Sequence, residues 1–89
     1  MLKPSYSKKF KKDFHKKIKA GKDKTKLLDL ARKLISQEPL DPCYRDHKLI
    51  GNYKNHWECH IEPDWLLIYK IEGDEIFFER TGSHSELFK

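Results

Sequence analysis

Five consecutive apolar residues, Trp-Leu-Leu-Ile-Tyr at positions 65–69, place the tightest constraint on how this chain folds. Side chains alternate between the two faces of a strand, so a strand over residues 65–71 is apolar on both faces, as expected of a central strand. Turn signals bound it, Pro63-Asp64 before and Gly73-Asp74 after. The run is far shorter than the roughly 20 apolar residues of a membrane-spanning helix. The pattern therefore predicts the central strand of a sheet and excludes a membrane protein.

Further strands are predicted on either side of this central strand. Residues 56–62 alternate strictly, with Trp57, Cys59 and Ile61 on one face and four polar residues on the other. The turn at residues 73–74 closes a hairpin into a strand over residues 75–81. Residues 48–50 lead to a second turn signal, Gly51-Asn52, and residues 1–6 give a weak first strand.

The N-terminal third of the chain has helical rather than strand periodicity. Phe10, Phe14 and Ile18 recur every four residues within residues 7–20 and form a narrow apolar stripe among lysines. Ser7 can cap the start of this helix and Gly21 its end. Residues 25–37 carry a broader apolar face and stop before a proline. Because only a short turn joins the two helices, an antiparallel helical hairpin is predicted.

The elements follow the order β-α-α-β-β-β and predict an α+β fold, an antiparallel sheet packed against an N-terminal helical hairpin. At 89 residues the chain has room for one domain, spanning residues 1–89. No hydrophobic stretch follows the first residues, so no secretory signal is expected. In the reducing cytoplasm, Cys43 and Cys59 are expected to be free thiols.

Charge is unevenly divided along the chain. Residues 1–33 hold 13 Lys or Arg and three Asp, whereas residues 34–89 hold six Lys or Arg and 11 Asp or Glu. This asymmetry favours a basic element that meets a polyanion or an acidic partner protein. A solvated lysine-rich helix that only keeps the protein soluble explains the composition equally well, so both interpretations stay open at this point.

Residues able to carry chemistry gather near the ends of the predicted strands, where side chains can converge on a cleft without occupying the core. They are His47, His60, Asp64, Arg80 and His84. RNA can be cleaved by its own 2′-hydroxyl if a base takes the hydroxyl proton, an acid protonates the departing 5′ oxygen and a cation stabilises the phosphorane. Imidazole suits both proton roles, and the guanidinium fork suits phosphate.

Two other interpretations of these residues stay open. A metal site built from His60, Asp64 and His84 is conceivable, but no metal-ligand spacing is present, so metal-free chemistry is favoured. The histidines and Arg80 can also serve the fold by satisfying buried polar groups or by covering the sheet. That structural role is the more common one for any single histidine and weakens when the set is taken together.

Three segments carry a resemblance to a known family. They are Asp-His-Lys-Leu-Ile-Gly at 46–51, Cys-His-Ile-Glu-Pro-Asp-Trp-Leu-Leu-Ile-Tyr at 59–69, and Arg-Thr-Gly-Ser-His-Ser-Glu-Leu-Phe at 80–88. In these the chain resembles the YafQ-type toxins of bacterial type II toxin–antitoxin systems, within the RelE/ParE superfamily. The resemblance implies a RelE-like fold and a small cytoplasmic mRNA interferase without a cofactor, which cuts messenger RNA, typically on the ribosome. It also implies neutralisation by a cognate antitoxin and no membrane partner.

The resemblance also implies roles for individual residues. His84 is the expected general acid, and Asp64 with His47 or His60 is expected to act as the general base or to orient it. Arg80 is expected to stabilise the phosphate. Phe88 is expected to stack on a base or position the tail, and Trp65 falls beside these positions.

One position departs from the family pattern. Relatives often carry an arginine where this chain has Trp57. Lys54 or Arg45 is the expected substitute for a phosphate contact there. A ParE-like gyrase poison of the same fold, which lacks the histidine set, and a basic RNA-binding module without chemistry remain the alternative functions.

Overall fold

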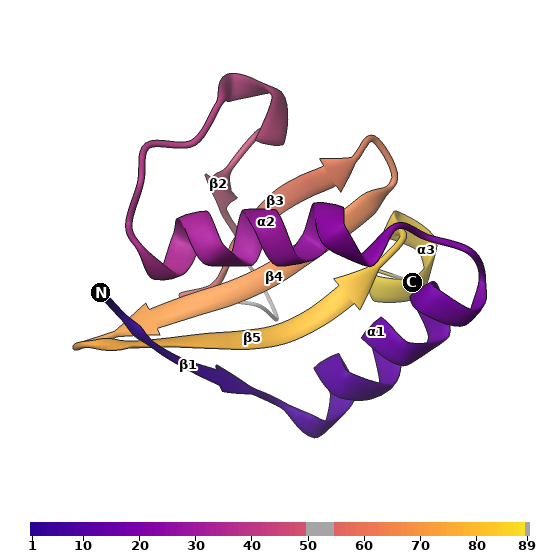
Figure 1. Ribbon diagram of the computed structural model, residues 1–89, viewed down its shortest axis with the longest axis horizontal. Coiled ribbons are helices and arrows are strands. Elements are labelled where there is room, and N and C mark those ends of the chain that lie inside the picture. Colours follow the sequence, from indigo (N-terminus) through magenta and orange to yellow (C-terminus); the bar gives the residue numbers. More distant parts are fainter. Residues whose placement is uncertain (50–54, 89) are drawn as a thin grey trace.

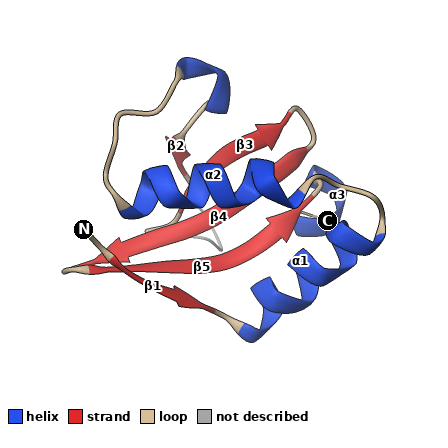
Figure 2. Cartoon of the chain, in the orientation of Figure 1, coloured by secondary structure: helices blue, strands red, loops and turns tan. Residues whose placement is uncertain are grey.

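The computed structural model describes residues 1–49 and 55–88 (Figures 1 and 2). Its elements are β1 (Lys3–Tyr6), α1 (Lys8–Lys19), α2 (Lys24–Ile35), the 3-10 helix η1 (Pro42–Tyr44), β2 (His47–Lys48), β3 (Trp57–Glu62), β4 (Trp65–Glu72), β5 (Glu75–Gly82) and α3 (His84–Leu87). The α+β class is confirmed. The predicted turn at Gly51-Asn52 lies outside the described residues.

The strands form a five-stranded sheet in the order β1-β5-β4-β3-β2. Strands β2 to β5 pair antiparallel, but β1 pairs parallel with β5, so the prediction of a wholly antiparallel sheet is wrong at this edge. An antiparallel neighbour needs only a tight turn, whereas β1 leads into the helices, and a long connection of this kind is what parallel pairing requires. As predicted, β4 is a central strand, with β5 and β3 as its neighbours.

The main core lies between the two long helices and one face of the sheet, where α2 runs across the strands in Figure 1. The helices contribute Phe10 from α1 and a row of buried residues from α2: Leu27, Leu30, Ala31 and Leu34. The sheet contributes Cys59, Trp65, Leu67, Tyr69, Ile76 and Phe78. The predicted covering of one sheet face by the helices is therefore confirmed.

The N-cap residue of helix α1, Ser7, is also hydrogen-bonded to the sheet. The Ser7 hydroxyl accepts the backbone N–H of Phe10 at 2.9 Å and donates to the carbonyl of Glu79 at 2.8 Å. One side chain thus satisfies an orphan amide of the helix and fixes the helix start against β5. Gly21 follows the helix with φ +94°, a left-handed conformation that glycine adopts without steric cost.

The opposite face of β4 is covered by a helix that the periodicity did not reveal. Leu66 and Ile68 are fully buried there against Leu87 of α3. A capping box forms α3: the Ser83 hydroxyl accepts the Glu86 amide, and the Glu86 carboxylate accepts the Ser83 amide.

Both cysteines are free thiols, Cys43 exposed and Cys59 buried in the core, as predicted. Burial raises the pKa of the Cys59 thiol well above its usual value. Among the described residues, no helix has the length and apolar character needed to cross a membrane.

The buried Thr81 hydroxyl of β5 forms two hydrogen bonds to β4, and substitution of Thr81 tests how much they stabilise the fold. It accepts the indole N–H of Trp65 at 3.0 Å and donates to the carbonyl of Leu66 at 2.7 Å. We expect Thr81→Val to lower the free energy of unfolding by about 2–3 kcal/mol, because two buried polar groups lose their partner. Thr81→Ser, which keeps the hydroxyl, should lose less. Urea denaturation of both variants measures the difference, and equal losses would contradict the prediction.

Candidate active site

A buried carboxylate lies at the centre of the candidate site. Glu58 is on β3, where the alternation that sends Cys59 into the core turns Glu58 to the opposite face, and the residue is only 5% exposed. Its Oε1 lies 3.1 Å from Nε2 of His60 and 4.0 Å from Nε2 of His84, and its Oε2 lies 3.4 Å from Nε2 of His47. Three imidazoles from three elements therefore surround one carboxylate.

His47 is oriented by the loop that carries it. Its Nδ1 lies 2.8 Å from the carbonyl oxygen of Arg45. Because a carbonyl can only accept, Nδ1 carries the proton of this bond and Nε2 is the atom turned to Glu58. Asp46, which precedes His47, accepts the Tyr69 hydroxyl at 2.8 Å, and this bond connects the loop to β4. Burial raises the pKa of Asp46 and that of Tyr69.

His84 is oriented in the same way by Asp64. The Asp64 carboxylate accepts both the backbone N–H of His84 at 2.9 Å and the ring Nδ1–H at 2.6 Å. These bonds hold the pKa of Asp64 below its usual value. Since Asp64 occupies Nδ1, the ring presents Nε2 to Glu58 and the pocket.

Helix α3, which carries His84, is anchored at its other side by Glu86. The Glu86 carboxylate pairs with Lys17 at 2.6 Å and Lys16 at 3.3 Å, both on α1. The Lys17 contact and the capping bond from Ser83 lower the pKa of Glu86 to about 2. Ion pairs, a capping box and the buried Leu87 thus hold the short helix against the sheet and α1.

The cluster opens into a pocket of about 630 Å³. Phe88 and Arg45 lie at its rim with exposed side chains, and the remaining lining residues are His47, Lys48, Leu49, Glu58, His60, Pro63 and His84. The side chains of His47 and His84 are 52% and 53% exposed, whereas that of His60 is 8% exposed. Two imidazoles are thus open to a ligand, and the third is enclosed.

The structure brings together most of the residues singled out in the sequence. His47, His60 and His84 meet around Glu58, and Asp64 reaches the group through its bonds to His84. Arg45 and Phe88 line the same pocket.

Three of the predicted residues lie elsewhere. Trp65 is fully buried on the helix-covered face, so the expectation that it lies beside the site is corrected: strand alternation sends it into the core. Arg80 lies on the same face of the sheet as Glu58. Its guanidinium, however, is bonded to Asp13 of α1, and Arg80 does not line the histidine pocket. Lys54 lies outside the described residues.

Glu58 is the member of this cluster that sequence reasoning missed, although a signal was available. It stands two positions before His60 in an alternating strand, which places both side chains on one face. Its burial, which the sequence does not reveal, makes it important. The enclosed ring of His60 has Nε2 3.1 Å from the Glu58 carboxylate, while its buried Nδ1 has no hydrogen-bond partner among the described residues.

The same cluster has the composition of a metal site. Glu58, His60 and His84 each offer one ligand atom, and these atoms lie within 4.8 Å of one another. Imidazole and carboxylate suit zinc and copper ions. Asp64, which the sequence offered as a third ligand, holds the far nitrogen of His84 instead.

The family model described as "Bacterial toxin of type II toxin-antitoxin system, YafQ" matches residues 2–89. The chain belongs to the YafQ toxin family. It is 44% identical to the mRNA interferase toxin YafQ of Escherichia coli K12 over 84 residues, which cover 93% of this chain and 91% of that relative. This match and the family model together confirm the resemblance read from the three sequence segments.

Solved structures agree with this membership. A copper-bound mutant toxin from Helicobacter pylori is 46% identical with a TM-score of 0.94, covering 99% of this chain and 100% of that one. The YafQ chain of an E. coli DinJ–YafQ complex is 41% identical with a TM-score of 0.92, and each chain is covered completely. The RelE-like architecture of this YafQ family member is thereby confirmed.

The carboxylates that anchor α3 give a prediction about acid. The pKa values of Asp64 and Glu86 are lowered in the folded state, so the stability they contribute is complete above their unfolded values, about 3.9 and 4.3. It is lost as the pH falls through the folded values. We expect the difference in free energy of unfolding between the native chain and Glu86→Gln to stay constant from about pH 8 to pH 5 and to shrink below about pH 4, because the two chains share every histidine and differ only at Glu86. Urea denaturation across this pH range measures the difference. A difference that changes mainly between pH 5 and 7 would contradict the assignment.

Proposed function

We propose that this YafQ family member is an endoribonuclease that cleaves messenger RNA without a metal ion, by attack of the 2′-hydroxyl on the adjacent phosphate. The observation that carries the proposal is a pair of exposed imidazoles, His47 and His84, on either side of Glu58. Each has Nδ1 held by an oxygen and Nε2 turned to the pocket. The name of the E. coli relative, an mRNA interferase toxin, supports the same activity.

His84 is suited to be the general acid. In its protonated form, Nε2–H faces the pocket and can give its proton to the departing 5′ oxygen. Asp64 holds the opposite nitrogen at 2.6 Å, so its negative charge stabilises the imidazolium and fixes the ring direction. Asp64 is therefore an orienting residue rather than the base that the sequence left open.

His47 is suited to be the general base. With Nδ1–H bonded to the Arg45 carbonyl, the lone pair of a neutral ring is on Nε2, and half of the side chain is open to a ligand. Glu58, 3.4 Å away, would stabilise the charge that the ring gains with the proton. His60 is enclosed and is best suited to position Glu58, from which it lies 3.1 Å.

Residues at the rim of the pocket are suited to stabilise the phosphorane charge and to stack on a base. Arg45 is the guanidinium that lines this pocket among the described residues, so it is suited to stabilise the phosphorane charge. Phe88, 42% exposed at the rim, is suited to stack on a base. Arg80 is proposed to contact a phosphate of the RNA next to the scissile one, because it does not line the histidine pocket.

The proposal includes macromolecular partners. The E. coli YafQ structure in complex with DinJ supports a cognate antitoxin for this chain. We propose messenger RNA as the substrate, cut in the cytoplasm and in association with the ribosome. A non-catalytic RNA-binding or gyrase-poisoning module is the alternative.

Cleavage should depend on His84 while folding does not. We expect His84→Ala to lower the rate of RNA cleavage by about 10²–10⁴-fold, because it removes the proton donor, and to abolish growth arrest. Thermal unfolding and RNA binding should change little, since the ring is half exposed. His15→Ala is the matched control, because His15 is exposed on α1 away from this pocket. If the His84 variant cuts at the normal rate, the acid is misassigned, and if the native protein cuts no RNA either alone or with ribosomes present, the alternative function stands.

Metal ions should inhibit rather than activate. A zinc or copper ion held by Glu58, His60 and His84 would occupy Nε2 of the general acid, and the H. pylori relative is described as copper-bound. We expect EDTA to leave cleavage unchanged and added Zn²⁺ or Cu²⁺ to suppress it. Cys43→Ser is a control for binding at the exposed thiol. Loss of activity in EDTA, restored by Zn²⁺, would overturn the metal-independent mechanism.

A further inference from the structure

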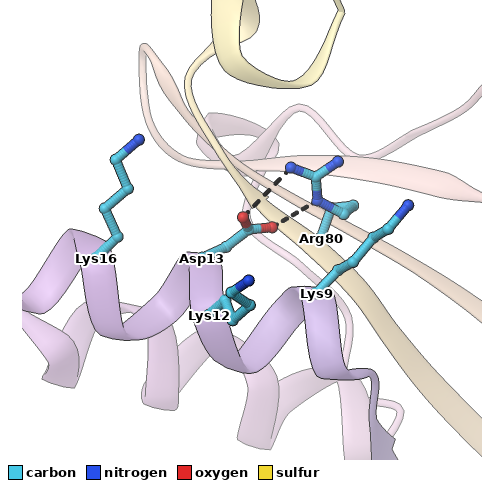
Figure 3. A pocket seen from close by; sticks show the side chains of 5 residues that line it. All are labelled: Lys9, Lys12, Asp13, Lys16 and Arg80. Atoms are coloured by element: carbon cyan, nitrogen blue, oxygen red, sulfur yellow. Dashed lines mark hydrogen bonds and ion pairs between the residues drawn. The ribbon is translucent and has the colours of Figure 1, made fainter.

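A second pocket, lined entirely by charged side chains, lies between α1 and β5 (Figure 3). It has a volume of about 460 Å³ and is formed by Lys9, Lys12, Asp13, Lys16 and Arg80. The four α1 residues follow one another at helical spacing and share one face of the helix. In Figure 3 the lysines surround the Asp13–Arg80 pair, with Lys9 and Lys16 on opposite sides of it.

Asp13 fixes the guanidinium in the wall of this pocket. Its carboxylate accepts Nε–H of Arg80 at 2.6 Å, Nη2–H at 3.3 Å and the backbone N–H of Thr81 at 3.2 Å. A two-point contact with a carboxylate sets both the position and the plane of the fork. Arg80 is thereby held toward α1 while its backbone remains part of β5.

The pocket keeps an excess of positive charge. Asp13 balances one of four cations, and the exposed Lys16 also contacts Glu86 at 3.3 Å. Within residues 1–49 and 55–88, Lys9 and Lys12 form no ion pair. Two ammonium groups therefore face the pocket without a counter-charge.

Strand pairing relates this pocket to the imidazole cluster. Arg80 pairs with Ile68 and Ile68 with Glu58, so the three residues form one row across the sheet on the same face. Neighbouring strands lie about 4.8 Å apart, which places the Cα atoms of Arg80 and Glu58 about 10 Å apart. An extended nucleic-acid strand can span that separation.

We propose that Lys9, Lys12 and Arg80 form a second phosphate site, which binds the RNA backbone beside the scissile bond. The proposal rests on the ribonuclease function and adds a substrate contact outside the catalytic pocket. RNA is favoured over an acidic protein segment because no apolar side chain lines the pocket, whereas stable protein interfaces bury apolar or aromatic anchors. A phosphodiester needs only cations, and Lys9 and Lys12 supply two of them beside a guanidinium that Asp13 holds in position.

The salt dependence of RNA binding tests this site. In the His84→Ala background, which prevents cleavage, we compare Lys9→Ala/Lys12→Ala with the control pair Lys11→Ala/Lys24→Ala, which removes equal charge from exposed positions outside the pocket. The ligand is a short single-stranded RNA. We expect the pocket pair to weaken binding and to reduce the slope of log K against log salt by about 1.4, because each phosphate contact contributes about 0.7. The control pair should leave the slope nearly unchanged.

Kinetics and a second ligand separate the possible outcomes. With His84 intact, the pocket pair should raise KM for RNA cleavage more than it lowers kcat, because it removes binding rather than proton transfer. Equal slopes for the two pairs, or a loss that falls on polyglutamate and spares RNA, would overturn the phosphate site. If the native chain cuts no RNA either alone or with ribosomes present, the ribonuclease function fails, while the slope comparison still tests the phosphate site independently.

Discussion

The double burial of β4 is the constraint on which the rest of the structure depends. Trp65 and Leu67 face the helices, while Leu66 and Ile68 face the other way and need a cover of their own. That cover is α3, whose Leu87 packs on both residues. Because His84 begins the same short helix, covering the second face of β4 also delivers an imidazole to Glu58.

The site in turn depends on how a buried carboxylate is satisfied. Removing an ionised group from water is costly unless charge and hydrogen bonds compensate. Glu58 faces three imidazole nitrogens at 3.1 to 4.0 Å, from β2, β3 and α3. Arg45 and Asp64 hold the outer nitrogens of the two exposed rings and so set the direction of both Nε2 atoms. The Nε2 proton of His84 that helps to compensate Glu58 is therefore the proton that the proposed acid delivers, whereas the proposed base His47 stabilises Glu58 only once its Nε2 has accepted a proton.

Periodicity predicted the helices and the three long strands because a buried face repeats regularly in the sequence. It did not predict the direction of β1 or the helix α3, since a parallel edge and a one-turn helix leave no periodic signal; only the Ser83–Glu86 spacing marked the latter. The histidines of the site were predicted as a group from their types and positions. Glu58 and the pairing of Arg80 with Asp13 were not, because burial and long-range ion pairs are set by tertiary packing.

The uneven charge of the chain acts within the fold before it acts on a partner. Ion pairs join the basic helices to the acidic second half: Lys17 to Glu86, and Lys22 and Lys26 to Glu62. Asp13 reverses the pattern by holding Arg80. These pairs neutralise charge where the helices meet the sheet and dock α3, which carries His84. Lys9, Lys12 and Lys16 of α1 line the pocket that also holds Arg80. The basic composition therefore contributes to ion pairs between helices and sheet and to a localised cationic pocket, in addition to the exposed helix surface.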